Sequence, residues 1–341
     1  MGMLIAAWLM GGMLAGPPVN NAELKRFEFS RTEMAVQFAI IMYAPDDATA
    51  AAAADAALDR IHALNSILSD YEEESELRQL CLHSSEGNPV RVSDDLWRVL
   101  RHALELSRQT DGAFDVSIGP LTKLWRRARR LKELPSPEAV KTAFARVDYR
   151  AIRLYADRQA VELLKPNMAL DLGGIAKGYA LEEAAKVVKS RGISRFLIRA
   201  GGDMVLGDAP PDKSGWRVGV GQIDADKPPR LFLSLANVEI ATSGDRFQFA
   251  EIGERRYSHI IDPKTGQPLT GRCQATVVVP RGTQADGLAS SLCIMGPEKG
   301  LPMLEKIPGA AAYLITIDEQ TGKEDSRQSQ RWKDLPVAED E

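Results

Sequence analysis

The stretch Asp171-Leu-Gly-Gly-Ile-Ala-Lys-Gly178 decides the fold around it, because a run of helix-forming residues, 179–190, follows it without a break. A carboxylate opens the stretch, and three glycines and Lys177 follow it. Glycine lets the backbone approach a ligand closely, and a helix N-terminus presents free N–H groups and a positive dipole end to an anion. The stretch therefore predicts an anion-binding cradle beside a carboxylate, or else a strand-to-helix turn whose glycines serve only packing.

Two nucleotide-binding patterns are absent from this stretch. It fits neither the GxxxxGK[ST] loop that cradles phosphates nor the GxGxxG fingerprint of dinucleotide-binding folds. The chain as a whole has 341 residues, a formal net charge of −4 and 6% aromatic residues. A net negative charge and few aromatic side chains argue against nucleic-acid binding, because phosphates need a basic surface and unpaired bases need stacking partners.

The order of the expected elements favours an α+β fold of mixed, largely antiparallel sheets with packed helices. Helical and strand patterns are interspersed without strict βαβ alternation, and the strands come in hairpin-like pairs. We expect a strand pair in residues 24–43, or one strand with a turn near 30–31. Another pair is expected in residues 149–164, with its turn at 157–158. No linker rich in proline, glycine and serine divides the chain, so residues 21–330 are expected to form a single catalytic domain.

Both ends of the chain differ from this domain. Residues 3–15 are apolar but too short to span a bilayer as a helix, and they resemble the core of a secretory signal without its basic leader. Residues 1–20 are therefore expected to be a signal segment or a disordered tail. A signal segment would place the protein in the periplasm or on the outer face of the cytoplasmic membrane, with the cytoplasm as the alternative. The polar residues 331–341 are expected to fray.

The three cysteines do not form a metal-binding pattern. Cys81, Cys273 and Cys293 show no CxxC spacing and no cysteine–histidine spacing, so a zinc site is not expected. Cys293 lies in an apolar run and is expected to be a small buried residue. A single disulfide is compatible with the sequence but not required by it.

Five short motifs combine glycine or proline with polar side chains at expected strand ends and helix starts. They are Asp111-Gly-Ala-Phe-Asp115, the opening stretch, Thr242-Ser-Gly-Asp245, His259-Ile-Ile-Asp-Pro-Lys-Thr-Gly266 and Ala285-Asp-Gly-Leu-Ala-Ser290. In the last of them, Asp286 and Ser290 are four residues apart at a helix start and share one face. A carboxylate and a hydroxyl placed in this way predict either ligands of a hard cation such as Mg²⁺ or a pair that caps the helix.

Two other features point to the chemistry of the site. Of the four histidines, only His259 lies at a strand end just before an Asp-Pro turn, which makes it a candidate general base; the alternative is a structural role. Residues 125–132 carry five basic side chains. Such a run is most often a solvated helix face, and its alternative role is to guide an anionic substrate.

Taken together, these motifs resemble the ApbE family, the FAD:protein FMN transferases. The likeness runs from about residue 34 to residue 317 and follows the order and spacing of the family. The motifs that carry it are Leu68-Ser-Asp-Tyr71, Ser75-Glu-Leu77, Asp111-Gly-Ala-Phe-Asp115, Gly119-Pro-Leu121, the opening stretch through Tyr179, Gly201-Gly-Asp203, Ala241-Thr-Ser-Gly-Asp245, Ser258 through Gly266, and Ala285, Asp286 and Ser290. The resemblance implies an ApbE-like fold related to the T-fold.

The resemblance also implies an activity and its residues. The family binds FAD and a divalent metal, usually Mg²⁺, transfers the FMN half through a phosphoester to a threonine of a target flavoprotein, and releases AMP. His259 would help to deprotonate that threonine. The metal would be held by Asp286, by the Ser290 hydroxyl and by the backbone carbonyl of Gly174. The flavin and adenine contacts would include Met34, Tyr71, Ala113, Phe114, Asp115, Asp171 and Lys177. The family usually reads Met-Gly-Thr at its first strand, where this chain has Met34-Ala35-Val36.

Two other functions would use the same site. An FAD pyrophosphatase would use water as the acceptor and yield FMN and AMP, and a flavin-binding carrier would hold FAD without turnover. The expected partners are FAD and a target flavoprotein subunit that bears the acceptor threonine, with no nucleic acid. Contact with a membrane would come only through that acceptor or through an uncleaved N-terminal segment.

Overall fold

The fold is described by a computed structural model, which covers residues 24–224, 227–246, 248–280, 283–319 and 321–339. The expected signal segment, residues 1–20, lies outside these described residues. Among the described residues, no helix is both long enough and apolar enough to cross a membrane.

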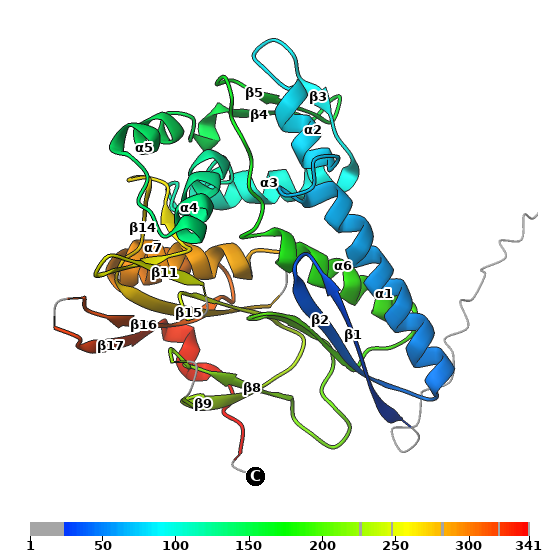
Figure 1. Cartoon of the computed structure of the whole chain (residues 1–341). Helices are drawn as coiled ribbons and strands as arrows, with labels where there is room; N and C mark the ends of the chain where they lie inside the picture. The colour runs from blue at the N-terminus through cyan, green and yellow to red at the C-terminus, as the bar shows by residue number, and fades with distance from the viewer. Residues whose placement is uncertain (1–23, 225–226, 247, 281–282, 320, 340–341) are drawn as a thin grey trace, which may run out of the picture.

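Helices and strands are interspersed along the chain, as Figure 1 shows. The helices are α1 (Asp47–Leu68), α2 (Glu76–His83), α3 (Asp94–Gln109), α4 (Gly119–Leu131), α5 (Pro137–Phe144), α6 (Ala176–Ser190) and α7 (Ala285–Leu304), with short 3₁₀ turns η2 (Tyr149–Ala151) and η3 (Gln330–Asp334). The strands are β1 (Lys25–Glu33), β2 (Val36–Ala44), β3 (Val90–Arg91), β4 (Ile152–Tyr155), β5 (Ala160–Leu163), β6 (Phe196–Ala200), β7 (Asp203–Leu206), β8 (Trp216–Val220), β9 (Leu231–Leu235), β10 (Glu239–Gly244), β11 (Phe249–Ile252), β12 (Arg255–Ser258), β13 (Ile261–Asp262), β14 (Gln267–Pro268), β15 (Arg272–Val279), β16 (Ala311–Ile317) and β17 (Glu324–Gln328).

An eight-stranded sheet forms the centre of the molecule. Its strand order is β1-β2-β6-β7-β10-β15-β16-β17, and each neighbouring pair is antiparallel. Helices α1, α6 and α7 pack on one face, while the β8–β9 hairpin and η3 lie on the other (Figure 1). This arrangement confirms the expected α+β class with largely antiparallel sheets.

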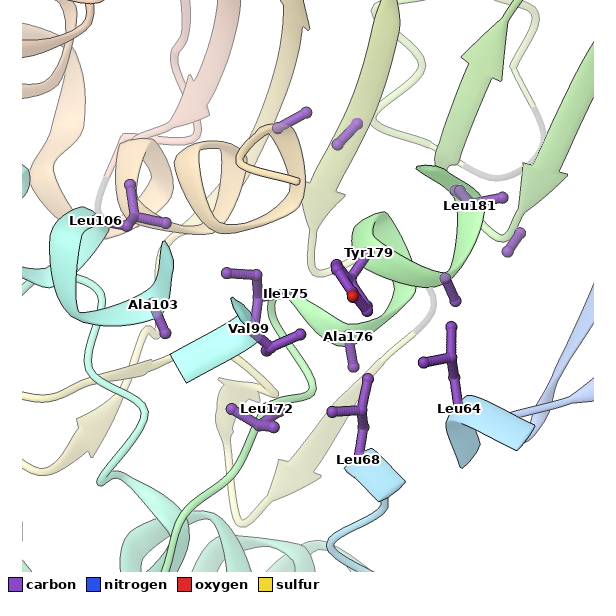
Figure 2. Close-up of a cluster of buried hydrophobic side chains, with 14 of the residues drawn as sticks. Leu64, Leu68, Val99, Ala103, Leu106, Leu172, Ile175, Ala176, Tyr179 and Leu181 are labelled. Atoms are coloured by element: carbon purple, nitrogen blue, oxygen red, sulfur yellow. The ribbon is translucent and has the colours of Figure 1, made fainter. Parts of the chain in front are cut away.

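The opening stretch is anchored in the main hydrophobic core by its apolar side chains. Figure 2 shows Leu172 and Ile175 packed in a cluster that includes Leu68 of α1 and Ala103 of α3. Leu172 and Ile175 are almost completely buried, and burying one such side chain contributes about 1.5–3 kcal/mol. Because the apolar side chains of the stretch are held in the core, its backbone and polar residues are positioned at the surface of the neighbouring cavity.

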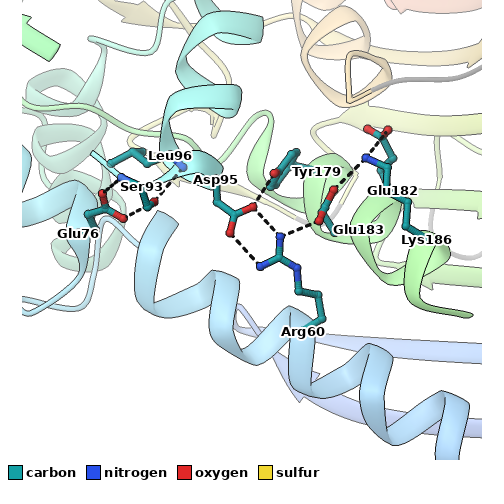
Figure 3. A network of polar contacts seen from close by, with 9 residues as sticks. All are labelled: Arg60, Glu76, Ser93, Asp95, Leu96, Tyr179, Glu182, Glu183 and Lys186. Atoms are coloured by element: carbon teal, nitrogen blue, oxygen red, sulfur yellow. Dashed lines mark hydrogen bonds and ion pairs between the residues drawn. The ribbon is translucent and has the colours of Figure 1, made fainter. Parts of the chain in front are cut away.

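A polar network fixes α6 against two other helices. Arg60 of α1 donates hydrogen bonds to both carboxylate oxygens of Asp95 of α3, at 2.9 and 2.5 Å, and to Glu183 of α6 at 2.6 Å (Figure 3). The hydroxyl of Tyr179 on α6 donates to Asp95 at 2.6 Å. Charge-assisted bonds are roughly twice as strong as neutral ones, so this network sets the position in which α6 begins.

The first hairpin turns later than the sequence suggests. Strands β1 and β2 pair along their whole length, and the two residues between them, Met34 and Ala35, have φ values of 49° and 58°. The expected turn near residues 30–31 is therefore wrong. A two-residue hairpin turn of this kind usually carries Asn-Gly or Gly-Gly, so the Met-Ala pair gives no turn signal in the sequence.

The structure confirms the second hairpin expected from the sequence but not the expected fraying of the C-terminal residues. Strands β4 and β5 pair antiparallel, which confirms the hairpin expected in residues 149–164. The fraying expected for residues 331–341 is wrong for the described part: Trp332 is buried and stacks on Tyr313, with ring centroids 5.6 Å apart, and Ser234 donates its backbone N–H to the carbonyl of Pro336. An aromatic anchor and backbone hydrogen bonds to β9 hold a segment whose composition is otherwise polar.

The strained turn leads to a stability prediction for Ala35→Gly. Ala35 is exposed, and a left-handed conformation costs a residue with a Cβ about 1–2 kcal/mol relative to its favoured conformations. Glycine adopts that conformation freely, although it loses more entropy on folding. We expect Ala35→Gly to raise the free energy of unfolding by about 0.5–1 kcal/mol, measured by urea denaturation.

Ala52→Gly is the matched control. Ala52 is also exposed, but it lies in the interior of α1, where glycine is expected to lower the free energy of unfolding by about 1 kcal/mol. A loss of stability in Ala35→Gly similar to that in Ala52→Gly would show that the turn is not strained as described.

Candidate active site

All the site residues implied by the resemblance line one cavity of about 890 Å³. They converge from six places in the fold: the β1–β2 turn, the loop after α1, the loop before α4, the opening stretch with the start of α6, the loop between β12 and β13, and the start of α7. These residues are Met34, Tyr71, Ala113, Phe114, Asp115, Asp171, Gly174, Lys177, His259, Asp286 and Ser290. The sequence motifs, although far apart along the chain, therefore share a single site.

The ammonium group of Lys177 joins two buried carboxylates at the back of the cavity. It donates to Asp286 of α7 at 2.8 Å and also to Asp203 of β7. Burial alone would lower the pKa of Lys177, but the two carboxylates raise it well above its usual value. Burial and the nearby charge of Asp286 raise the pKa of Asp203 to about 7, and Lys177 opposes that shift. Lys177 therefore holds together α6, β7 and α7 by charge.

A second cation, Arg126 of α4, joins two other carboxylates that line the cavity. Its guanidinium pairs with Asp171 at 3.1 Å and with Asp70, and it lies 4.3 Å from the ring centre of Tyr71. Asp171 also accepts the N–H of Gly173 at 2.8 Å. The carboxylate expected to contact FAD is thus held in place by two donors within the chain.

The glycines of the opening stretch support both interpretations made from the sequence. Gly173 and Gly174 line the cavity, and no side chain caps the N-terminus of α6 beside them. Gly178 serves packing, since a Cβ there would lie 3.1 Å from Oε1 of Glu239 and 3.3 Å from the carbonyl oxygen of Thr283. The stretch therefore combines a cavity wall open to an anion with a close helix–strand contact.

Asp286 and Ser290 lie one turn apart on α7 and face the cavity. No side chain makes a capping hydrogen bond at the N-terminus of α7, so the alternative of a capping pair does not hold. The Ser290 hydroxyl is 2.9 Å from that of Ser243 on β10, and Lys177 contacts only one oxygen of Asp286. A carboxylate and a hydroxyl are hard oxygen ligands of the kind that suits Mg²⁺, and Gly174, whose carbonyl the resemblance adds to the set, lines the same cavity.

This oxygen set contains only one carboxylate, which suits a cation whose remaining ligands come from a substrate and from water. Among the described residues, no group of three or more His, Cys, Asp or Glu side chains could hold a metal by itself. Mg²⁺ is commonly bound by one or two carboxylates and completes its shell with water and substrate phosphates. The residues present therefore fit such an ion together with a phosphate-bearing ligand.

His259 lies in the loop between β12 and β13 and is half-buried. Its Nδ1 is 3.1 Å from the carbonyl of Gln248, which fixes the ring. Burial lowers the pKa of His259, the contact with Gln248 opposes that shift, and the positive charges of Arg129 and Lys177 lower the pKa further. The imidazole is therefore neutral at pH 7 and able to accept a proton.

Asp115 is placed on the cavity wall but is occupied within the chain. One of its carboxylate oxygens accepts the N–H and the hydroxyl of Ser117, at 2.8 and 2.6 Å, and the other accepts the N–H of Tyr149 at 3.0 Å. Its side chain thus shapes the loop that presents Ala113 and Phe114 to the cavity. The three cysteines are free in the structure, and Cys293 is buried as expected.

Sequence reasoning missed part of the site. The basic run 125–132 is not simply a solvated face, because Arg126 and Arg129 line the cavity. Their spacing of three residues on a helix is the signal that could have separated them from their exposed neighbours. Asp203, which pairs with Lys177, belongs to the motif Gly201-Gly-Asp203, and its position at the start of a strand gives no indication of its partner.

The cavity brings together carboxylates, hydroxyls and cationic side chains from distant parts of the chain. Comparison with known proteins shows which family has this fold. A family model described as the ApbE family matches residues 32–315. A Haemophilus influenzae protein named FAD:protein FMN transferase is 30% identical over 282 residues, which cover 79% of this chain and 81% of that protein. A Treponema pallidum protein of the same name is 31% identical over 289 residues, with coverages of 79% and 80%.

Solved structures give the same result. The flavin transferase ApbE from Vibrio cholerae superposes with a TM-score of 0.80 at 26% identity, covering 92% of this chain and 99% of that one. The apo form of the Pseudomonas stutzeri flavinyl transferase ApbE also gives a TM-score of 0.80, at 25% identity, with coverages of 93% and 98%. This chain belongs to the ApbE family.

The charge pairing at the back of the cavity predicts the effect of Lys177→Met. The change leaves Asp203 and Asp286, both buried, without their shared cation. Breaking a buried ion pair on one side costs about 3 kcal/mol of stability. The loss should be larger at pH 8 than at pH 5, because Lys177 no longer opposes the raised pKa of Asp203, which takes up a proton as the pH falls.

Urea denaturation in the absence of divalent cations measures both effects, with Lys186→Met as the control. Lys186 is more than half exposed and also pairs with two carboxylates, Glu182 and Glu183. An exposed pair of this kind contributes less than about 1 kcal/mol. Equal losses in the two variants, or a larger loss for Lys177→Met at pH 5 than at pH 8, would contradict this description of the site.

Proposed function

We propose that this ApbE-family enzyme, an FAD:protein FMN transferase, passes the FMN half of FAD to a threonine hydroxyl of a target flavoprotein, depends on Mg²⁺, and releases AMP. The observation that carries the proposal is the meeting of two chemistries in one cavity: an oxygen ligand set at Gly174, Asp286 and Ser290, and a neutral imidazole at His259. Transfer between a phosphate and a hydroxyl needs both.

The three proposed metal ligands contribute different kinds of oxygen. Asp286 supplies the charged ligand, and Ser290 and the Gly174 carbonyl supply neutral oxygens. When bound, Mg²⁺ would neutralise charge on the diphosphate and stabilise AMP as the leaving group. Lys177 holds Asp286 in position, and the contact between the hydroxyls of Ser243 and Ser290 orients the latter.

His259 provides the base. Its free ring nitrogen takes the proton of the acceptor threonine as the threonine oxygen forms its bond to the phosphorus of the FMN half. The bond from that phosphorus to the AMP oxygen breaks, and AMP leaves with the electron pair. The Gln248 carbonyl fixes the other ring nitrogen, so the base does not need to reorient during the reaction.

The lowered pKa of His259 predicts the pH dependence. The neutral form is the active one, so kcat/KM should fall as the pH drops through the pKa of His259, with the midpoint below the usual value of about 6.5. His259→Gln should lower kcat by roughly 10²–10⁴-fold and remove this acidic limb. Steady-state rates measured between pH 5 and pH 8 give both results. An unchanged acidic limb in His259→Gln would exclude His259 as the base.

Mass spectrometry tests the transfer itself. Candidate flavoproteins incubated with the enzyme, FAD and Mg²⁺ should gain the mass of FMN on a threonine, in an adduct that survives denaturation. Asp286→Asn should lower this rate by more than roughly 10²-fold, because the charged metal ligand is lost. AMP release at full rate without any acceptor protein would instead identify an FAD pyrophosphatase. Stoichiometric FAD binding without turnover would identify a carrier.

A further inference from the structure

Helix α4 turns one face towards the cavity, and this face carries a cation that the mechanism above does not use. Thr122, Arg126 and Arg129 are spaced four and three residues apart, which places them on one side of the helix, and all three line the cavity. Arg127 and Arg130, from the same basic run, are exposed and do not line it. The helix thus separates its arginines into an inner and an outer set.

Arg129 differs from Lys177 and Arg126, the two cations described above, because it lacks their ion pairs. Lys177 and Arg126 each hold two carboxylates. Arg129 makes no ion pair or hydrogen bond with any side chain in the described part of the chain, although it is half-buried. Burial and the neighbouring charge of Arg126 lower its pKa. A partly desolvated cation without a counter-ion is unfavourable, so the site is more stable with an anion beside it.

We propose that Arg129 binds the diphosphate of FAD. Arg129 lines the same cavity as Tyr71 and His259 and lies close enough to both for its charge to act on them. The diphosphate is the anionic part of FAD, whereas the flavin ring, the ribityl chain and an acceptor hydroxyl are neutral. A guanidinium fits phosphate oxygens in a bidentate manner. Arg129 therefore makes the site bind phosphate-bearing flavins more tightly than riboflavin.

Equilibrium binding of FAD and of riboflavin, without Mg²⁺ and without an acceptor protein, tests this inference. Arg129→Gln should weaken FAD binding roughly 10- to 100-fold and leave riboflavin binding unchanged, because only FAD carries phosphate. Arg129→Lys should recover part of the affinity, since the charge remains while the bidentate geometry is lost. Arg130→Gln, on the outer face of the same helix, should bind both ligands as the unchanged protein does.

Two outcomes would overturn the proposal. Equal weakening of FAD and riboflavin in Arg129→Gln would show that Arg129 contacts the flavin ring or only supports the fold. Unchanged FAD binding, with a raised KM for the acceptor flavoprotein, would show that Arg129 recognises the acceptor instead. The proposal rests on FAD as the substrate. It does not depend on Mg²⁺ or on threonine as the acceptor, since the binding measurement includes neither.

Discussion

The ion pairs of Lys177 with Asp203 and Asp286 are the interaction on which the rest of the site depends. The lysine belongs to the first turn of α6, and its partners lie on β7 and at the start of α7. Both carboxylates are buried, so removing the cation would leave like charges facing each other in a medium that screens them poorly. The same contact positions Asp286, and therefore links the stability of the fold to the geometry of the proposed metal ligands.

Arg126 repeats this arrangement with a different pair of carboxylates, because it is shared between Asp70 and Asp171. Lys177 and Arg126 are thus each paired with two carboxylates of the chain. Arg129 lines the same cavity and makes no ion pair within the described residues, so its charge is left for a ligand.

Much of the fold and of the candidate site could be predicted from the sequence, because the relevant signals are local. The glycines beside Asp171 and Lys177 marked a helix start at the cavity, and the spacing of Asp286 and Ser290 placed a carboxylate and a hydroxyl on one helix face that lines it. The pairing of Lys177 with Asp203 was not predictable, because it joins a helix to a strand through tertiary packing. The Met34–Ala35 turn was missed since neither residue type favours the left-handed conformation that the hairpin imposes.

The proposed mechanism depends on Asp286 and its neighbours holding a divalent cation against the diphosphate of FAD. Phosphorus-31 NMR of enzyme-bound FAD, with Mn²⁺ in place of Mg²⁺, measures this directly, because Mn²⁺ broadens the resonances of nuclei close to it. We expect strong broadening of both diphosphate resonances in the unchanged protein and much weaker broadening in Asp286→Asn at the same concentrations of FAD and Mn²⁺. Equal broadening in the two proteins would contradict it.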